Sequence, residues 1–169
     1  QRFPEALTVH RLDMATSGLL VFARGEAMQR ALSVLFQDRQ VDKRYVAVVK
    51  GLLAQDQGEI DLPLSADWPN RPRQMVCFER GKPSQTRYEV LARDLDQGET
   101  RVALTPITGR SHQLRVHMLA LGHPMLGDPF YGDADSQARA PRLLLHAAAL
   151  SLTHPQTGER MHWSSAPPF

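Results

Sequence analysis

Three stretches with strand character follow one another in the middle of the chain, separated only by short turns. Residues 74–79 and 84–94 are joined through Arg80-Gly81-Lys82-Pro83, and Asp96-Gln97-Gly98 leads into a third stretch at 99–104. Glycine, proline and aspartate are residues that reverse a chain within a few steps. Consecutive strands with short connections pair antiparallel, so this part of the chain predicts an antiparallel meander.

Two segments carry apolar residues at the spacing of a helix. Between residues 26 and 38 these residues recur at i, i+4, i+7 and i+8, which places them on one helical face: Met28, Leu32, Leu35 and Phe36. The second segment, 111–121, is followed by Gly122, a residue type that commonly ends a helix. Its expected apolar face comprises Leu114, Met118 and Leu121.

The remaining strands are expected before and after these helices. Their ranges are 7–9, 19–23, 44–49, 143–152 and 160–164. Residues 67–73 contain two prolines and two arginines and predict an ordered loop without regular structure. Together the segments predict the α+β class: one domain over residues 1–169, built on a mostly antiparallel mixed β-sheet with flanking helices and loops.

The composition of the chain indicates its cellular compartment more clearly than it indicates its function. The formal net charge is only +2, which permits nucleic-acid binding without requiring it. The single cysteine, Cys77, excludes an internal disulfide and, between apolar neighbours, is expected to be a buried structural thiol. No apolar run reaches membrane-spanning length and no signal-peptide pattern is present, so a cytoplasmic protein without a membrane partner is expected.

The polar run Val9–Gly18 is the main candidate for chemistry. It places His10, Arg11 and Asp13 directly before the apolar stretch 19–23, which is expected to be a buried strand. Charged groups next to a buried strand are costly unless they are paired or used. A surface turn with a solvated charge pair is the plainer alternative.

Four segments in the same order resemble the RluA-type pseudouridine synthases. They are HRLDMATSG (10–18), KRYVAVVKG (43–51), GRSHQLRVHMLALGHPMLGD (109–128) and RLLLHAAAL (142–150). The resemblance implies the pseudouridine synthase catalytic fold and the isomerisation of uridine to pseudouridine in RNA. It also implies an upstream Lys-Pro segment that is absent here, so the sequence is expected to lack its N-terminal segment.

The resemblance implies roles for four residues. Asp13 matches the catalytic nucleophile, and Arg115 matches the arginine that pairs with it. Tyr45 matches a tyrosine that stacks on the target base, and Arg11 an arginine that replaces the flipped base in the RNA. A carboxylate can serve as a nucleophile in such chemistry, although the sequence leaves open whether it attacks the sugar or the base.

Four further residues complete the expected substrate-binding site. Thr16 closes the motif, and His10, together with His146, is also expected to be a buried hydrogen-bonding residue that holds the turn. Arg110 is either a second partner of Asp13 or a phosphate contact. Leu144 is expected to line the uracil site, although core packing would explain it equally well.

No metal or cofactor is expected. His112 and His117 are five residues apart, which separates them by about 140° on a helix, and one cysteine cannot form a zinc cluster. The aspartyl-phosphate phosphotransferases are the enzymatic rival, but Ala15 stands where they require a second aspartate. A catalytically inactive RNA-binding module is the other alternative.

RNA is the expected partner, and the protein is expected to be a monomer. Basic side chains that could follow a phosphate backbone are Arg24, Arg39, Lys43, Arg44, Arg71, Arg73 and Arg110. Met14-Ala15 and residues 67–72 resemble the dual-specificity branch of the family. That branch acts on a tRNA anticodon stem-loop and on a 23S-type rRNA stem-loop.

Overall fold

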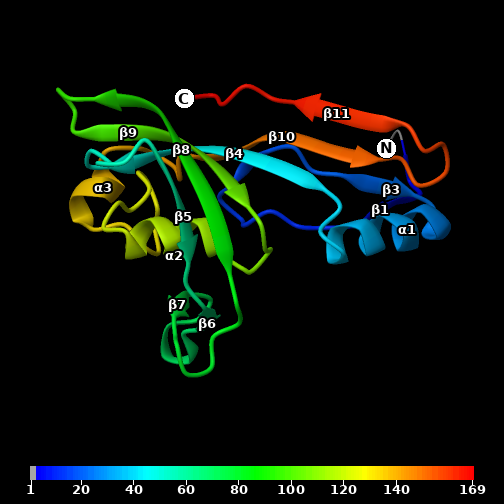
Figure 1. Ribbon diagram of the computed structural model, residues 1–169, viewed down its shortest axis with the longest axis horizontal. Helices are drawn as coiled ribbons and strands as arrows, with labels where there is room; N and C mark the ends of the chain where they lie inside the picture. The colour runs from blue at the N-terminus through cyan, green and yellow to red at the C-terminus, as the bar shows by residue number, and fades with distance from the viewer. Residues whose placement is uncertain (1–2) are drawn as a thin grey trace.

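The computed structural model describes residues 3–169 and is built on one long sheet (Figure 1). Its strands are ordered β11-β10-β4-β9-β8-β5, and each neighbouring pair is antiparallel. In that order they span Arg160–Ser164, Leu145–Thr153, Asp42–Lys50, Glu99–Pro106, Gln85–Asp94 and Gln57–Asp61. The short strand β2 (Ser17–Gly18) pairs parallel to β10, so the sheet is mixed, and the α+β expectation is confirmed.

Helices and a small second sheet pack against the long sheet. Helix α1 (Glu26–Gln37) packs on the pair formed by β1 (Ala6–Thr8) and β3 (Phe22–Arg24). Helix α2 (Gln113–Ala120) lies below the central strands in Figure 1, and α3 (Ala134–Ala138) lies beside it. Of these helices in the described residues, none is long and apolar enough to span a bilayer.

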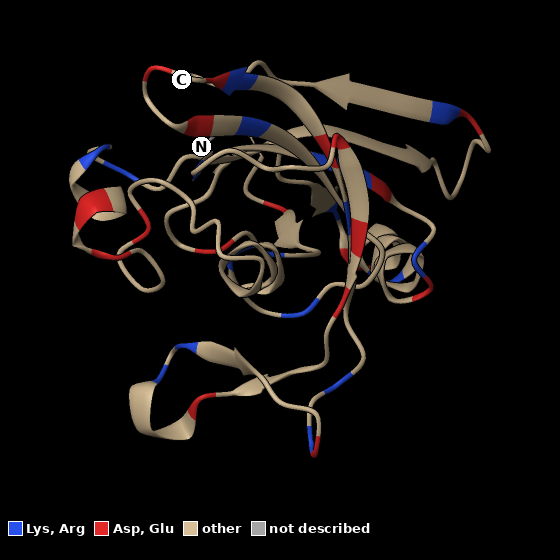
Figure 2. Ribbon diagram, turned by 60° about the vertical axis from the view of Figure 1, so that its left-hand side comes forward, with Lys and Arg blue, Asp and Glu red and all other residues tan. Residues whose placement is uncertain are grey.

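Residues 62–82 form an arm that projects from the body of the molecule (Figures 1 and 2). Strands β6 (Leu64–Ala66) and β7 (Gln74–Val76) pair antiparallel within it. The 3-10 helix η1 (Trp68–Asn70) connects them, so the expectation of a loop without regular structure is wrong for these three residues.

Several expected elements are confirmed and one pairing is wrong. The β8–β9 hairpin, α1 and β11 form where the sequence predicts them. Residues 74–79, however, do not pair with β8, because their strand turns back onto β6 and leaves that edge of β8 to β5. Cys77 lies in this arm and is half-buried, which contradicts the expectation of a buried thiol.

The stretch 19–23 is less buried than its composition suggests. Only Ala23 is inaccessible, while half of Phe22 is exposed (51%). The strand itself is restricted to β3, because residues 19–21 follow the positive-φ residue Gly18 and join β2 to β3. The expected buried strand at this place is therefore wrong in length and in burial.

The main core lies between the sheet and α2. Ala47 and Val49 of β4 contact Leu104 of β9 and Met118 of α2 in one fully buried cluster. The sequence predicts a helix with one apolar face, but α2 is buried almost all round, and its polar residue Arg115 is 2% exposed. A buried arginine requires partners, and these define the candidate site.

Candidate active site

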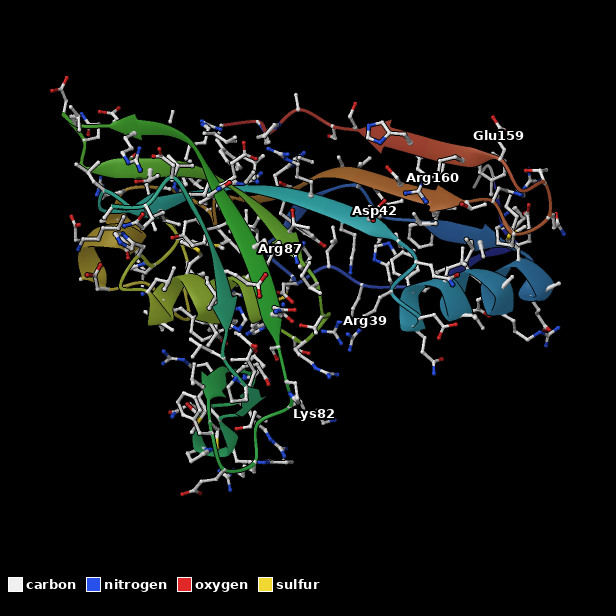
Figure 3. The ribbon with its side chains drawn as sticks, viewed as in Figure 1. Arg39, Asp42, Lys82, Arg87, Glu159 and Arg160 are labelled. Carbon is white, nitrogen blue, oxygen red and sulfur yellow. The ribbon has the colours of Figure 1, made fainter. Side chains whose placement is uncertain are left out.

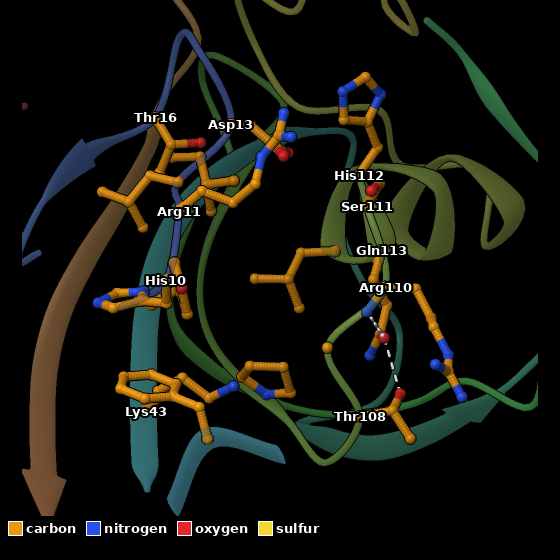
Figure 4. Close-up of a pocket in the computed structure, with 17 residues that line it drawn as sticks. His10, Arg11, Asp13, Thr16, Lys43, Thr108, Arg110, Ser111, His112 and Gln113 are labelled. Carbon is orange, nitrogen blue, oxygen red and sulfur yellow. Dashed lines mark hydrogen bonds between the residues drawn. The ribbon is translucent and has the colours of Figure 1, made fainter. Parts of the chain in front are cut away.

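A cavity of about 320 Å³ opens where three segments meet (Figure 4). The turn at 10–16 forms one wall, β4 contributes Lys43 and Tyr45, and the loop 106–113 between β9 and α2 forms the opposite wall. A volume of this size is at the lower end of the range for small-molecule sites and suits a single nucleotide better than a larger ligand.

Asp13 and Arg115 face each other at this cavity. The distance from Asp13 Oδ2 to Arg115 Nη1 is 3.7 Å, and the side chain of Asp13 is 20% exposed. Arg115 comes from the middle of α2, and its side chain is buried. The contact brings together the two residues that the resemblance expects to pair.

A second carboxylate, Asp128, holds Arg115 in place. Arg115 Nε donates to Asp128 Oδ2 at 2.8 Å and Nη2 donates to Oδ1 at 2.6 Å, while Asp128 is fully buried. Asp128 Oδ1 also accepts hydrogen bonds from the backbone N–H groups of Phe130 and Tyr131. This bidentate arrangement fixes the guanidinium plane and leaves Nη1 directed at Asp13.

The surroundings of Arg115 favour its charged form. Burial acts against the pKa of Arg115, but the hydrogen bonds and charge of Asp128, with the charge of Asp13, raise it overall. The guanidinium carbon also lies 4.9 Å from the centre of the Tyr131 ring. Arg115 is therefore a permanent cation that lies between two carboxylate side chains and beside an aromatic ring.

Tyr45 lies on β4 at the floor of the cavity. Burial raises its pKa to about 12, and the nearby charge of Asp13 adds to this effect. The hydroxyl is therefore protonated at neutral pH, and the ring is a neutral aromatic surface. Such a surface can stack on a nucleobase, which agrees with the role expected for Tyr45.

Hydrogen bonds inside residues 10–21 fix the turn that carries Asp13. The Thr16 backbone N–H donates to Asp13 O at 2.9 Å, and the Val21 N–H donates to His10 Nε2 at 3.0 Å. Burial lowers the pKa of His10 to about 4, and the charge of Lys43 contributes. His10 is therefore neutral at pH 7, as an acceptor at Nε2 must be.

The far end of the turn is attached to β10. His146 is 4% exposed, and its Nδ1 lies 2.8 Å from Ser17 Oγ. His10 and His146 thus both make hydrogen bonds that hold the turn, as expected, but only His146 is buried, and His10 is half-buried. Thr16 lines the cavity, and among residues 3–169 its buried Oγ1 has no hydrogen-bond partner.

The loop before α2 carries Arg110, which does not approach Asp13. Its Nε donates to Pro83 O at 3.3 Å, and its side chain lines the opposite wall. The loop is held by Gln113, whose Oε1 accepts from Thr108 Oγ1 at 2.7 Å and from the Arg110 N–H at 3.0 Å. Of the two expected partners for Asp13, Arg115 is the one in contact.

Two more expected site residues, Arg11 and Leu144, lie away from the interior of the cavity. Arg11 is exposed at the rim of the cavity, beside Asp13. Leu144 is not among the residues that line the cavity, whereas its neighbour Leu145 is; the expected contact of Leu144 with uracil stays a prediction. Adjacent residues at the start of a strand point to opposite faces, and the apolar run 143–145 gives no indication of which one faces the site.

His112 connects the cavity to the arm. It has a left-handed backbone (φ 53°) before α2, and its Nδ1 lies 2.7 Å from Tyr131 Oη. Tyr131 Oη in turn accepts from the backbone N–H of Gln74 at 2.7 Å. The Tyr131 hydroxyl proton is thus free to be donated to His112, and the base of the arm is fixed to the wall of the cavity.

Sequence reasoning missed Asp128, Gln113 and Tyr131. Asp128 ends the segment 109–128 that resembles the family, so its position in that motif is the signal that could have identified it. Gln113 lies within the same segment, whereas Tyr131 lies outside it and carries no such signal. The burial of a polar side chain is recognised only from its tertiary partners.

Comparisons with known proteins agree with this geometry. The family model described as RNA pseudouridylate synthase matches residues 4–120. The chain is 58% identical to the dual-specificity RNA pseudouridine synthase RluA of Yersinia pestis, over 99% of this chain and 81% of that protein. It is 55% identical to the protein of the same name from Escherichia coli K12, over 99% and 76% of the two chains.

A solved structure has the same fold. Human RNA Pseudouridylate Synthase Domain Containing 1 superposes with a TM-score of 0.88 at 33% identity, over 99% of this chain and 71% of that one. The family model covers more than half of the chain, and the identities extend over nearly all of it. The chain, with a carboxylate and a buried arginine paired at a nucleotide-sized cavity, belongs to the RNA pseudouridylate synthase family.

Proposed function

We propose that Asp13 is the nucleophile with which this enzyme isomerises uridine to pseudouridine in structured RNA. The observation that carries the proposal is the position of Asp13, 3.7 Å from a buried arginine and at the wall of a cavity of about 320 Å³. An ionised carboxylate kept beside a fixed cation is suited to attack an electrophilic carbon.

The reaction rearranges bonds within one nucleotide. The glycosidic bond between uracil N1 and ribose C1′ breaks, the uracil turns, and C5 forms a new bond to C1′. N1 gains a proton and C5 loses one, so the atoms balance without a cofactor. Asp13 engages the nucleotide during this exchange, and Arg115, held by Asp128, stabilises the carboxylate whenever it leaves as an anion.

The cavity supplies contacts for the detached uracil. Tyr45 offers its ring for stacking, and base–aromatic stacking contributes roughly 1–3 kcal/mol. Leu145, next to the expected Leu144, provides an apolar wall. The unpartnered Thr16 Oγ1 is available to hydrogen-bond a polar edge of the base. His10 contributes by holding the turn in shape.

We also propose that the substrates are a tRNA anticodon stem-loop and a large-subunit rRNA stem-loop. The names of the two RluA relatives include dual specificity, and their high identity supports the same range here. The arm adds a basic surface (Figure 2): it holds four arginines and lysines against two acids, a formal +2 that equals the net charge of the whole chain.

Two properties of the protein outside the site complete the proposal. We propose that it acts as a monomer in the cytoplasm, without membrane association. Stem-loop RNAs of both kinds are found in that compartment, and the single half-buried cysteine suits a reducing environment.

Tritium release from C5-labelled uridine tests the activity. Purified protein is incubated with each of the two stem-loops and with a stem-loop whose target position is cytidine. We expect release from both uridine substrates and none from the control. Binding of RNA without any release would favour the inactive RNA-binding module instead.

Arg11 gives a separate test of how the uridine reaches Asp13. Extruding a stacked base costs a few kcal/mol, and an exposed arginine beside the cavity can take its place in the stack. We expect Arg11→Ala to slow turnover on a folded stem-loop by at least tenfold more than on a flexible strand of the same sequence. Equal losses on both, with a salt dependence shallower by about 0.7, would identify a phosphate contact instead.

A further inference from the structure

The cavity contains positive charges that are not paired with a carboxylate in the described part of the chain. Asp13 is its one acidic lining residue in the described part of the chain, and it already faces Arg115. Three other lining residues are basic: Arg11, Lys43 and Arg110. Within residues 3–169 none of these three has a carboxylate oxygen within 4.0 Å, so the cavity has an excess of positive charge.

Lys43 is half-buried, as is Arg110, whereas Arg11 is exposed. Lys43 precedes Tyr45 by two residues on β4, so both side chains point from the same face of the sheet into the cavity. Its ammonium nitrogen approaches the loop on the opposite wall, since a Cβ atom on Gly109 would lie 3.9 Å from Lys43 Nζ. Lys43 therefore spans the gap between β4 and the loop that carries Arg110.

Within residues 3–169, no carboxylate or hydrogen-bond acceptor compensates this charge. Burial lowers the pKa of Lys43. The neighbouring ring of His10 is neutral and adds no negative charge. A desolvated ammonium without a partner reduces stability, and an anionic ligand would supply that partner.

The position of Lys43 indicates which part of the ligand it meets. In Figure 4, Lys43 and Asp13 lie at opposite ends of the cavity, with His10 between them. The reacting uracil and ribose C1′ have to be at Asp13. Uracil is neutral at pH 7, and the only anionic groups of an RNA nucleotide are its phosphates, which an ammonium binds as a point charge.

We propose that Lys43 binds a backbone phosphate that flanks the target uridine, and so sets how deeply the nucleotide enters the cavity. The proposal rests on the proposed function, because it takes the cavity as the site of the flipped uridine. Lys43 is then a substrate-positioning residue that acts at the opposite end of the nucleotide from Asp13.

A double-mutant cycle on binding tests the contact. RNA stem-loops carry a neutral methylphosphonate in place of the phosphate on the 5′ side or the 3′ side of the uridine. Their Kd values are measured for Asp13→Asn protein, and for the same protein with Lys43→Met or Lys43→Arg as a second substitution. Because Asp13→Asn protein is used throughout, the measurement does not depend on isomerisation and remains interpretable if the proposed activity is absent.

We expect Lys43→Met to weaken binding of unmodified RNA about tenfold, and Lys43→Arg to restore most of this loss. With one of the two methylphosphonates, Lys43→Met should cause no further loss, since the phosphate charge is already gone. Lys50→Met is the matched control, because Lys50 is on the same strand and pairs with Asp133 and Asp135 outside the cavity.

Thermal unfolding separates this role from a structural one. Removing an unpaired, partly buried charge should leave the Tm of Lys43→Met at or above that of the parent protein. The proposal is wrong if Lys43→Met weakens all RNAs by the same factor, whether the flanking phosphates are charged or neutral. It is also wrong if binding does not change, or if the loss of binding follows a lower Tm.

Discussion

Arg115 has two carboxylates as neighbours and is bonded closely to only one of them. Asp128 takes both a 2.8 Å and a 2.6 Å hydrogen bond, whereas Asp13 remains at 3.7 Å. The close pair is structural and fully buried, and the looser pair leaves Asp13 oxygens available to a substrate. The two carboxylates thus have different roles because they lie at different distances from one guanidinium.

Asp128→Asn should therefore damage both stability and activity. It leaves a buried arginine with half of its charge compensation lost, and breaking such a pair costs about 3–5 kcal/mol. We also expect kcat to fall at least tenfold, because Nη1 is no longer held toward Asp13. Chemical denaturation and tritium release measure the two effects. Asp135→Asn, in an exposed ion pair, should lose less than about 1 kcal/mol.

His10 should make stability depend on pH below neutrality. Its pKa is about 4 in the folded protein and 6.5 in an unfolded chain, so between these values the unfolded state binds more protons. Stability is complete above pH 6.5 and is lost as the pH falls toward 4, by about 1–2 kcal/mol because the side chain is only partly buried.

The test compares the wild type with His10→Gln, whose amide oxygen can still accept from the Val21 N–H. Burial also lowers the pKa of three other histidines, but these are common to both proteins: His112, His117 and His146. The wild-type Tm should fall more steeply than that of His10→Gln between pH 6.5 and 4. Parallel curves would show that His10 is not the group responsible.

At the scale of elements, the short parallel pair β2–β10 determines the position of the turn that carries Asp13. Gly18 lies opposite Ala147 in this pair with φ 110°, and a Cβ atom there would be 2.4 Å from Ala147 O. The backbones of Gly18 and Ala147 are therefore closer together than a side chain at position 18 would permit. Glycine at this position is therefore a requirement of the site and not only of a turn.

Gly18→Ala should destabilise the protein by about 2–4 kcal/mol, since backbone strain and a backbone clash add together. Gly98→Ala is the matched control: its φ is also positive (62°), but a Cβ atom there meets nothing within 4 Å. It should cost about 1–2 kcal/mol from conformation alone. Equal losses in the two variants, measured by denaturation, would mean that β2 does not pack on β10 as described.

The elements also show how far the sequence alone can lead. Periodicity and turn residues identified α1, the β8–β9 hairpin and β11, because each of these depends on local spacing. The pairing of residues 74–79 was wrong because a strand's partner is decided by the whole sheet and not by the nearest turn. In the same way, the sequence does not indicate which of the neighbours Leu144 and Leu145 lines the cavity, and the structure places Leu145 there.

The candidate site followed from resemblance more than from pattern. Asp13 and Arg115 are far apart in sequence, and nothing in either segment alone indicates that they meet. The motifs supplied that link, and the structure gave the contact. Asp128 lay unrecognised at the end of one of these motifs, since a buried carboxylate and an exposed one look identical in sequence.

For the molecule as a whole, the cavity and the arm together form the surface that we propose binds RNA. Tyr131 joins them, since its hydroxyl contacts both Gln74 of the arm and His112 of the cavity. The basic residue Lys82 lies on the arm in Figure 3, whereas Arg160 and Asp42 pair across β11 and β4, away from it. The formal charges outside the arm cancel, whereas the arm, where RNA is expected to bind, carries the excess of positive charge.

Asp13→Asn is the measurement that tests this account most directly. The amide is nearly the same size as the carboxylate but is a poor nucleophile. Tritium release from C5-labelled stem-loop RNA and the Kd for the same RNA are measured for the wild type, Asp13→Asn and the exposed control Asp96→Asn. We predict no detectable release by Asp13→Asn, a Kd within about threefold of the wild type, and full activity of Asp96→Asn. Appreciable turnover by folded Asp13→Asn protein would contradict the assignment of Asp13 as the nucleophile.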